Sequence, residues 1–251
     1  MEERFVLTDA QWAKIEPHCL GKVGDPGRSG LNNRLFVEGV LWIARTGSPW
    51  RDLPPWFGKW NTVFKRYRDW VKAGVFQKLF EALSDEPDME YAMIDGTVVK
   101  VHRHGQGAKG GTKSQAIGRS VTGWATKIVA LTDALGNLVR FVIIPGQHFD
   151  TVGVAPLIQQ ADFAALLADK AFDVEWIREA LEKQKAEAVI PQRKNRIVKR
   201  DYDKTTYKAR HLIENFFAKL KEFKRIAMRS DKTDQSFKAM IYLAAATINS
   251  R

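Results

Sequence analysis

The sequence contains a single cysteine, Cys19, among its 251 residues. One cysteine excludes an intrachain disulfide and a cysteine-rich zinc site. The chain also lacks an apolar run of 18 residues and a signal-like amino terminus, which argues against membrane insertion and secretion. We therefore expect no membrane partner and a cytoplasmic location, where a reducing environment suits the lone thiol.

Acidic side chains are also scarce relative to basic ones. The chain has 29 Asp and Glu against 40 Lys and Arg, giving a net charge of +11. Such a surplus favours an acidic polymer as partner, and nucleic acid ahead of a membrane surface. Hydrophobic residues make up 45% of the chain, including eight tryptophans, which supports a packed core and argues against wholesale disorder. The length allows one large domain, or one domain with a smaller companion.

Residues 1–88 predict a small helical domain that holds six of the eight tryptophans. Thr8 or Asp9 can cap a helix that starts at Ala10. Further helices are predicted over Asn33–Arg45, Trp60–Lys72 and Val75–Leu83. The acidic, proline-containing stretch at 84–88 then marks the expected domain boundary.

The helix predicted over Trp60–Lys72 carries a cationic face. That face includes Thr62, Lys65, Arg66 and Lys72. Many surface helices are this basic, so the face alone indicates little. Its position in a small tryptophan-rich helical domain favours a helix-turn-helix that binds DNA.

Residues 89–251 predict a mixed α/β domain with a five-stranded sheet flanked by helices. The strands are expected at 91–101, 127–132, 138–144, 163–168 and 188–190, and the helices at 150–160, 173–185 and 234–249. The turn at 133–137 predicts that the second and third strands are antiparallel. Strands joined through helices are expected to be parallel.

Two basic segments interrupt these elements, at 103–123 and 192–210. The first is rich in glycine but lacks the GxxxxGK[ST] spacing of a nucleotide cradle, so a mobile loop near DNA is the preferred interpretation. The second is the densest basic stretch and includes Arg193, Lys194 and Arg196 as candidate DNA contacts. His102 and His104 stand two apart at a strand end, a poor spacing for a metal site.

Three separated carboxylates are the candidate catalytic and metal-binding residues: Asp95, Asp169 and Glu214. Asp95 and Asp169 each follow an apolar run and are predicted at neighbouring strand ends. Taken alone, either could be a turn or capping residue, and Asp173 is a good candidate helix N-cap beside Asp169. Together they suit hard divalent cations, which prefer oxygen ligands and can clamp the two oxygens of a phosphoryl transfer.

Glu214 belongs to a pattern that also includes Tyr207, Arg210 and Lys221. On one continuous helix these four side chains would fall within roughly 60° of one another. Arg210 and Glu214 could form an ordinary exposed i, i+4 ion pair. However, the apolar residues of this helix occupy a separate sector, so the stripe faces solvent or a cleft in which cations hold phosphate.

These motifs resemble the DDE transposases of bacterial insertion sequences, in the superfamily of insertion sequences four and five. The matching blocks are Leu7–Trp12, Gly47–Pro54, Ile94–Thr97, Ala168–Asp173 and the Tyr-x2-Arg-x3-Glu-x6-Lys signature at Tyr207, Arg210, Glu214 and Lys221. Phe172 stands where the family often has Tyr. The resemblance implies an RNase H-like core with Asp95, Asp169 and Glu214 as its triad. The last two are only 45 positions apart, which leaves no room for a large insertion domain.

The implied activity is binding of the element's terminal inverted repeats, cleavage at its ends and strand transfer into double-stranded target DNA. Two Mg²⁺ ions per active site, with Mn²⁺ as substitute, a homodimer in the synaptic complex and association with the nucleoid also follow from the resemblance. Arg210 and Lys221 would orient phosphate, with support from Tyr207. The alternatives are a catalytically inactive DNA-binding repressor and a structure-specific nuclease of the same fold.

Overall fold

The computed structural model describes residues 5–22, 24–25, 30, 32–121, 123–159, 161–196 and 200–250. The chain folds into two compact units. The first comprises Met1–Asp85, His102–Ala108 and Leu220–Arg251, and the second comprises Glu86–Val101 and Lys109–Lys219. The carboxyl-terminal residues therefore belong to the same unit as the amino-terminal helices, whereas the sequence suggested one boundary at residue 88.

Helices build the first unit. They are α1 (Asp9–Ile15), α2 (Asn33–Thr46), α3 (Trp60–Lys72), α4 (Val75–Leu83), α9 (Lys224–Ala227) and α10 (Asp234–Asn249), with short 3-10 turns η1 (Glu16–His18), η2 (Trp50–Asp52), η3 (Pro55–Phe57) and η4 (Arg103–Gln106) and the two-residue strand β7 (Met228–Arg229). The predicted bounds of the third, fourth and last helices are confirmed. Thr8 caps α1 in a capping box with Gln11.

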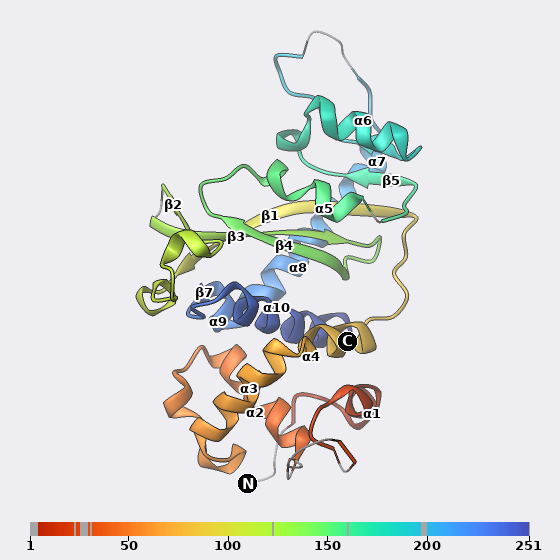
Figure 1. Cartoon of the computed structure of the whole chain (residues 1–251). Helices are drawn as coiled ribbons and strands as arrows, with labels where there is room; N and C mark the ends of the chain where they lie inside the picture. Colours follow the sequence, from red (N-terminus) through yellow and green to blue (C-terminus); the bar gives the residue numbers. More distant parts are fainter. Residues whose placement is uncertain are drawn as a thin grey trace. The chain divides into compact units, whose positions relative to one another are not determined.

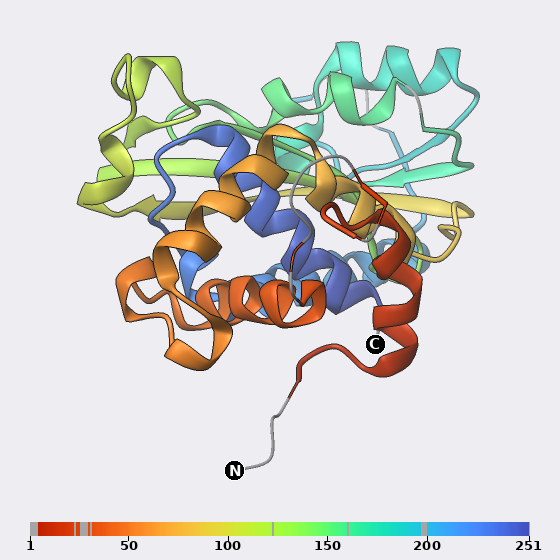
Figure 2. The same ribbon diagram turned by 60° about the horizontal axis from the view of Figure 1, so that its bottom comes forward.

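The last helix forms the centre of this unit. Its side chains Phe237, Met240, Ile241 and Leu243 are buried, and α10 packs against α2, α3 and α4. Figure 1 and Figure 2 both show α10 lying among these helices. A helix that is apolar around most of its circumference needs neighbours on several sides. This requirement explains why residues 234–249 join a unit built mainly from the start of the chain.

A mixed sheet organises the second unit. Its strands are β1 (Tyr91–Val101), β2 (Gly118–Ser120), β3 (Gly123–Thr132), β4 (Leu138–Pro145), β5 (Ala165–Leu167) and β6 (Glu187–Val189). The path runs β2-β3-β1-β5-β6, with β4 also paired to β3. The predicted antiparallel pairing of β3 with β4 and parallel pairing of β5 with its neighbours are confirmed. The expected count of five strands was too low, since β2 forms inside the predicted loop at 103–123.

The helical elements of the second unit are shorter than predicted. They are α5 (Ala155–Ile158), α6 (Glu175–Lys183), α7 (Lys204–Tyr207) and α8 (His211–Glu222), which continues into the first unit, with turns η5 (Thr112–Ser114), η6 (Asp150–Gly153), η7 (Lys170–Phe172) and η8 (Lys208–Arg210). The helix expected over 150–160 is divided into η6 and α5, and Pro156 lies at the start of α5. Its predicted end, Gln160, lies outside the described residues, as do Thr122 and Lys199 of the two basic segments.

Ile94 and Asp95 are neighbours in β1 but point to opposite faces of the sheet, and this alternation determines on which face the Asp95 carboxylate lies. Ile94 of β1 and Val129 of β3 pack with Leu157 of α5 and Ile177 of α6 in one core cluster. Successive side chains of a strand point to opposite faces. Asp95 therefore points away from this cluster, toward the face over which α8 runs (Figure 1).

No helix among the described residues is long and apolar enough to span a membrane.

Candidate active site

Asp95 lies in the middle of β1 and not at a strand end, so that prediction was wrong. The strand continues because Asp95 pairs with Ala130 of β3 on one side. On the other side, the pairing of β1 with β5 stops at Met93 and Leu167. Asp95 is thus two residues beyond the last pair with β5.

Asp169 occupies the matching position after β5, again two residues beyond the last pair. Because the strands are parallel, this register carries both aspartates to the same end of the β1–β5 pair. Asp169 Oδ1 accepts a hydrogen bond from Ala171 N at 2.7 Å and caps η7. The capping role is therefore real, and it leaves the second carboxylate oxygen of Asp169 for other partners.

The electrostatics of Asp95 reflect partial burial beside another acid. Burial raises the pKa of Asp95, and the nearby Asp169 carboxylate raises it further, while the Gly96 N–H and Arg210 act in the opposite direction. The net result is a pKa above the ordinary value for aspartate. Carboxylates with a perturbed pKa are common at functional sites, which agrees with the candidate role of Asp95.

Arg210 joins Asp95 to Glu214. Its Nη1 donates to Asp95 Oδ2 at 2.7 Å, and its Nη2 forms an ion pair with Glu214. Burial lowers the pKa of Arg210, but Asp95 and Glu214 outweigh that effect and raise it above the usual value. Tyr207 lies close to Arg210 and Asp169, and burial raises the pKa of its hydroxyl group. The i, i+4 ion pair of Arg210 with Glu214 is therefore present, and the same guanidinium also pairs with Asp95 of β1.

The helix that carries this group is not continuous, which corrects the predicted stripe. Residues 204–207 form α7, residues 208–210 form the 3-10 turn η8, and α8 begins at His211. A rotation of 100° per residue therefore does not apply between Tyr207 and Arg210. Glu214 remains exposed in the first turn of α8. Lys221 is exposed near the end of α8, in the first compact unit.

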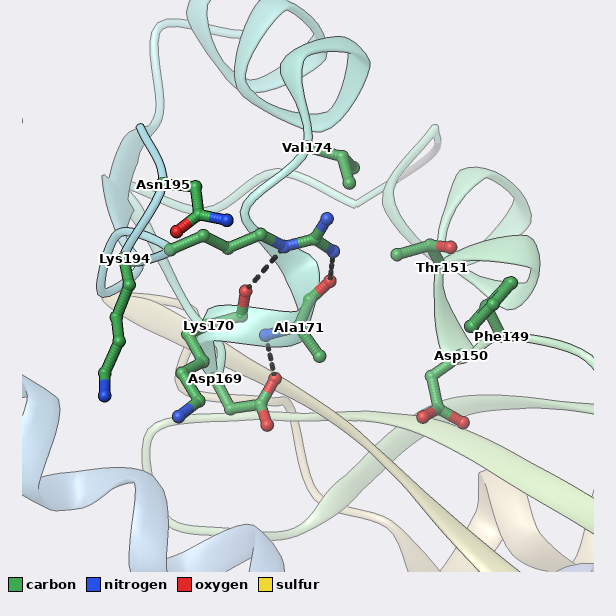
Figure 3. Close-up of a pocket in the computed structure, with 10 residues that line it drawn as sticks. Phe149, Asp150, Thr151, Asp169, Lys170, Ala171, Val174, Lys194 and Asn195 are labelled. Carbon is green, nitrogen blue, oxygen red and sulfur yellow. Dashed lines mark hydrogen bonds between the residues drawn. The ribbon is translucent and has the colours of Figure 1, made fainter. Parts of the chain in front are cut away.

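A pocket of about 940 Å³ opens beside Asp169. Its lining is formed by residues 149–151, 169–171, 174 and 193–195. In Figure 3, Lys170 and Lys194 extend on the side of Asp169, and Asp150 lies across the pocket from it. One carboxylate of the candidate triad thus borders a cavity with cationic side chains, which suits an anionic ligand.

Sequence reasoning missed Asp150. Its carboxylate forms an ion pair with Lys127 of β3 at 3.0 Å. It also packs against Gly96 of β1, where an added Cβ would lie 2.5 Å from Asp150 Oδ1. Because successive side chains of a strand alternate, this contact is on the face of β1 opposite to Asp95. The glycine that follows Asp95 is the signal that could have indicated this approach, because a strand glycine often marks close contact with another segment.

The basic segment at 192–210 is largely engaged within the protein. Arg193 donates to the carbonyls of Lys170 and Ala171, and Arg196 pairs with Asp173 and Glu175. Asp173 does not cap α6 as predicted, because the cap position is Val174. It is instead a buried acceptor for arginines. Of the three candidate DNA contacts here, Lys194 has no hydrogen bond or ion pair within the described chain.

The cationic face of α3 likewise includes both exposed side chains and one that packs inside the protein. Thr62, Lys65 and Lys72 are exposed, and Lys72 lies 3.9 Å from Asp69. Arg66 is half-buried, with its guanidinium over the rings of Phe36 and Trp70. Arg66 therefore contributes to packing inside the first unit and is not part of the open face.

The donor chemistry of the site suits a divalent metal, whereas its present arrangement is closed by an arginine. Asp95, Asp169 and Glu214 offer hard oxygen donors. Within the described residues, however, His, Cys, Asp and Glu form no group of three placed to hold a metal. Arg210 lies between Asp95 and Glu214 and supplies the positive charge there. In the first unit, His102 accepts from the His104 N–H, a local turn contact.

Comparison with known proteins assigns the family. Residues 86–249 match the family described as "Transposase DDE domain", and residues 7–80 match "Putative transposase of IS4/5 family". No solved structure matches the chain.

Three curated relatives each match less than half of this chain, and each match spans most of the relative's own length. "Uncharacterized protein y4sN" of Sinorhizobium fredii is 42% identical over 44% of this chain and 90% of its own length. "Insertion element IS402 uncharacterized 16.2 kDa protein" of Burkholderia cepacia is 33% identical over 40% of this chain and 77% of its own length. "Putative transposase for insertion sequence element IS6501" of Brucella ovis is 35% identical over 49% of this chain and 96% of its own length. With both family models and these relatives in agreement, the chain belongs to the DDE transposases of insertion sequences.

Proposed function

We propose that this transposase binds the terminal inverted repeats of its own element, cuts the DNA at the element ends and joins the freed ends to target DNA. The observation that carries the proposal is the register of β1 and β5, which places Asp95 and Asp169 at one end of a parallel pair. The sheet order also supports an RNase H-like core, in which such a pair bears catalytic carboxylates.

Asp95, Asp169 and Glu214 would hold Mg²⁺, or Mn²⁺ as substitute, at two positions in the site. The bound ions would supply Lewis-acid activation of the oxygens that attack and leave phosphorus. A metal would compete with Arg210 for Asp95 Oδ2 and Glu214 Oε1, because Arg210 now pairs with both of these oxygens. A released guanidinium beside the site could then bind a phosphate of the DNA, as Arg does through paired hydrogen bonds.

The remaining residues position the DNA. Lys170 and Lys194 line the pocket next to Asp169 and would neutralise backbone phosphates. Tyr207 would support Arg210, and Lys221 would contact phosphate outside the second unit. Residues 1–88 would act as a helix-turn-helix-like DNA-binding domain through Thr62, Lys65 and Lys72, and residues 89–251 would carry catalysis. Synapsis of two element ends would require a homodimer.

Cleavage of labelled inverted-repeat DNA tests the proposal. Asp95→Asn, Asp169→Asn and Glu214→Gln remove one charge each with little change in shape, so we expect loss of Mg²⁺-dependent cleavage with retained DNA binding. Full cleavage by any of the three would exclude the assignment.

The two alternatives give different products. A structure-specific nuclease would leave cut ends and no strand transfer into plasmid. A repressor with an inactive core would bind the repeats and cut nothing at any Mg²⁺ or Mn²⁺ concentration.

A further inference from the structure

Asp173 is a buried charge with three donors around it. Its side chain has no exposed surface. It accepts from Arg178 Nε at 2.7 Å, from Arg196 Nε at 2.8 Å and from the backbone N of Arg193 at 2.8 Å. A buried carboxylate is tolerated when its lone pairs are satisfied in this way. These contacts tie the segment after β6 to the start of α6.

The contacts extend from Asp173 to the candidate metal ligand Asp169. The Arg193 guanidinium donates from Nη2 to Ala171 O at 2.6 Å and from Nε to Lys170 O at 3.3 Å. The N–H of Ala171 in turn donates to Asp169 Oδ1 at 2.7 Å. Figure 3 shows these bonds around η7. The turn that orients Asp169 is therefore held from both sides of Ala171.

We propose that Arg193 and Asp173 are positioning residues that fix the turn at 169–172 and so orient the Asp169 carboxylate, whereas their neighbour Lys194 contacts DNA. The ordering of the turn stands on the hydrogen bonds alone, while its effect on metal use rests on the proposed function. Arg193 suits this role because a planar guanidinium can reach two carbonyls in fixed geometry, which a lysine cannot.

Adjacent basic residues with opposite roles allow a matched test in the full-length chain. Arg193→Gln and Lys194→Gln each remove one positive charge, one position apart. Three quantities are measured for each: amide hydrogen exchange of residues 169–172 without DNA, the salt dependence of DNA affinity, and the Mg²⁺ concentration that gives half-maximal end cleavage. Far-UV circular dichroism checks that both variants fold.

For Arg193→Gln we expect about 10-fold faster exchange of the Ala171 amide, since its turn loses two hydrogen bonds. The Mg²⁺ requirement should rise by about 10-fold, as for other residues that orient ligands, with an unchanged salt slope. Lys194→Gln should lower the salt slope by about 1 and leave exchange and Mg²⁺ requirement unchanged. Arg193→Lys keeps the charge and should still show fast exchange.

The proposal is overturned if Arg193→Gln leaves the exchange at 169–172 unchanged, or if it lowers the salt slope as Lys194→Gln does. It is also overturned if Arg193→Lys restores wild-type exchange, because charge alone would then suffice. Failure of the proposed function looks different: the wild-type chain would show no end cleavage, while the exchange result for Arg193→Gln would be unaffected.

Discussion

Asp95 and Asp173 are both paired with arginine in the same compact unit, yet their pKa values move in opposite directions. Asp173 is fully buried, but three donors outweigh the cost of burial and lower its pKa to about 2. Asp95 is only partly buried, but it has one arginine and one N–H, and its pKa is raised. At Asp173 the hydrogen bonds from its donors outweigh the cost of burial, whereas at Asp95 the cost of burial prevails over one arginine and one N–H.

Removing the charge of Asp95 should have the largest effect of the substitutions considered, and the quantity affected should be catalytic activity. Asp95→Asn keeps the shape of the side chain but removes the negative charge that would bind a metal. We expect end cleavage to fall by on the order of 10³-fold, as for loss of a single electrostatic group at a reacting centre. Single-turnover cleavage of labelled repeat DNA measures it. A loss below about 10-fold would place Asp95 outside the active site.

The same substitution at Asp173 should act on stability. Asp173→Asn leaves Arg178 and Arg196 without their buried counter-charge, which typically costs about 3 kcal/mol of unfolding free energy or more. Urea denaturation measures this change. Asp162→Asn, at an exposed position of the same unit, serves as control and should change stability by no more than about 0.5 kcal/mol. Equal effects of the two substitutions would contradict a structural role for Asp173.

Acid should remove the contribution of Asp173 in a defined pH window. A carboxylate with a lowered pKa stabilises the folded state above its unfolded pKa, near 3.9, and this stability is lost as pH falls toward the folded value of about 2. The expected loss is about 2 kcal/mol between pH 4 and 2. Comparing urea midpoints of the wild type and Asp173→Asn across this window isolates it. Parallel pH profiles would show that Asp173 is not the group responsible.

The smallest expected effect is that of Asp95→Asn on stability. Because the raised pKa means that ionised Asp95 is disfavoured in the folded state, removing its charge should not weaken the fold. We expect a change within about 0.5 kcal/mol, or a slight gain. A loss as large as that of Asp173→Asn would remove the distinction between the two carboxylates.

The elements predicted well from the sequence are those that local signals define. Trp60–Lys72 and Val75–Leu83 form helices as expected because their apolar periodicity is strong and Gly74, at φ 68°, separates them. Asp95 was placed at a strand end because sequence shows where one strand loses its apolar character, but not that β3 continues to pair where β5 stops.

The parts of the site that were missed depend on distant contacts. Asp173 looked like a helix cap because its partners Arg193 and Arg196 lie 20 and 23 residues away. Arg66 looked like an open cation because nothing in the local pattern indicates that it packs over Phe36. Asp150 was missed for the same reason: nothing in the local pattern indicates that it packs against Gly96 of β1 or lines the pocket beside Asp169.

The most direct test of the account compares Asp169→Asn with Asp173→Asn, two aspartates four residues apart, in one end-cleavage assay across a range of Mg²⁺ concentrations. Asp169→Asn is expected to be inactive at every concentration, because one of the proposed metal ligands is lost. Asp173→Asn is expected to regain most of its activity at high Mg²⁺, because only the orientation of Asp169 is weakened. Recovery of Asp169→Asn at high Mg²⁺, with Asp173→Asn inactive throughout, would contradict the assignment of the two roles.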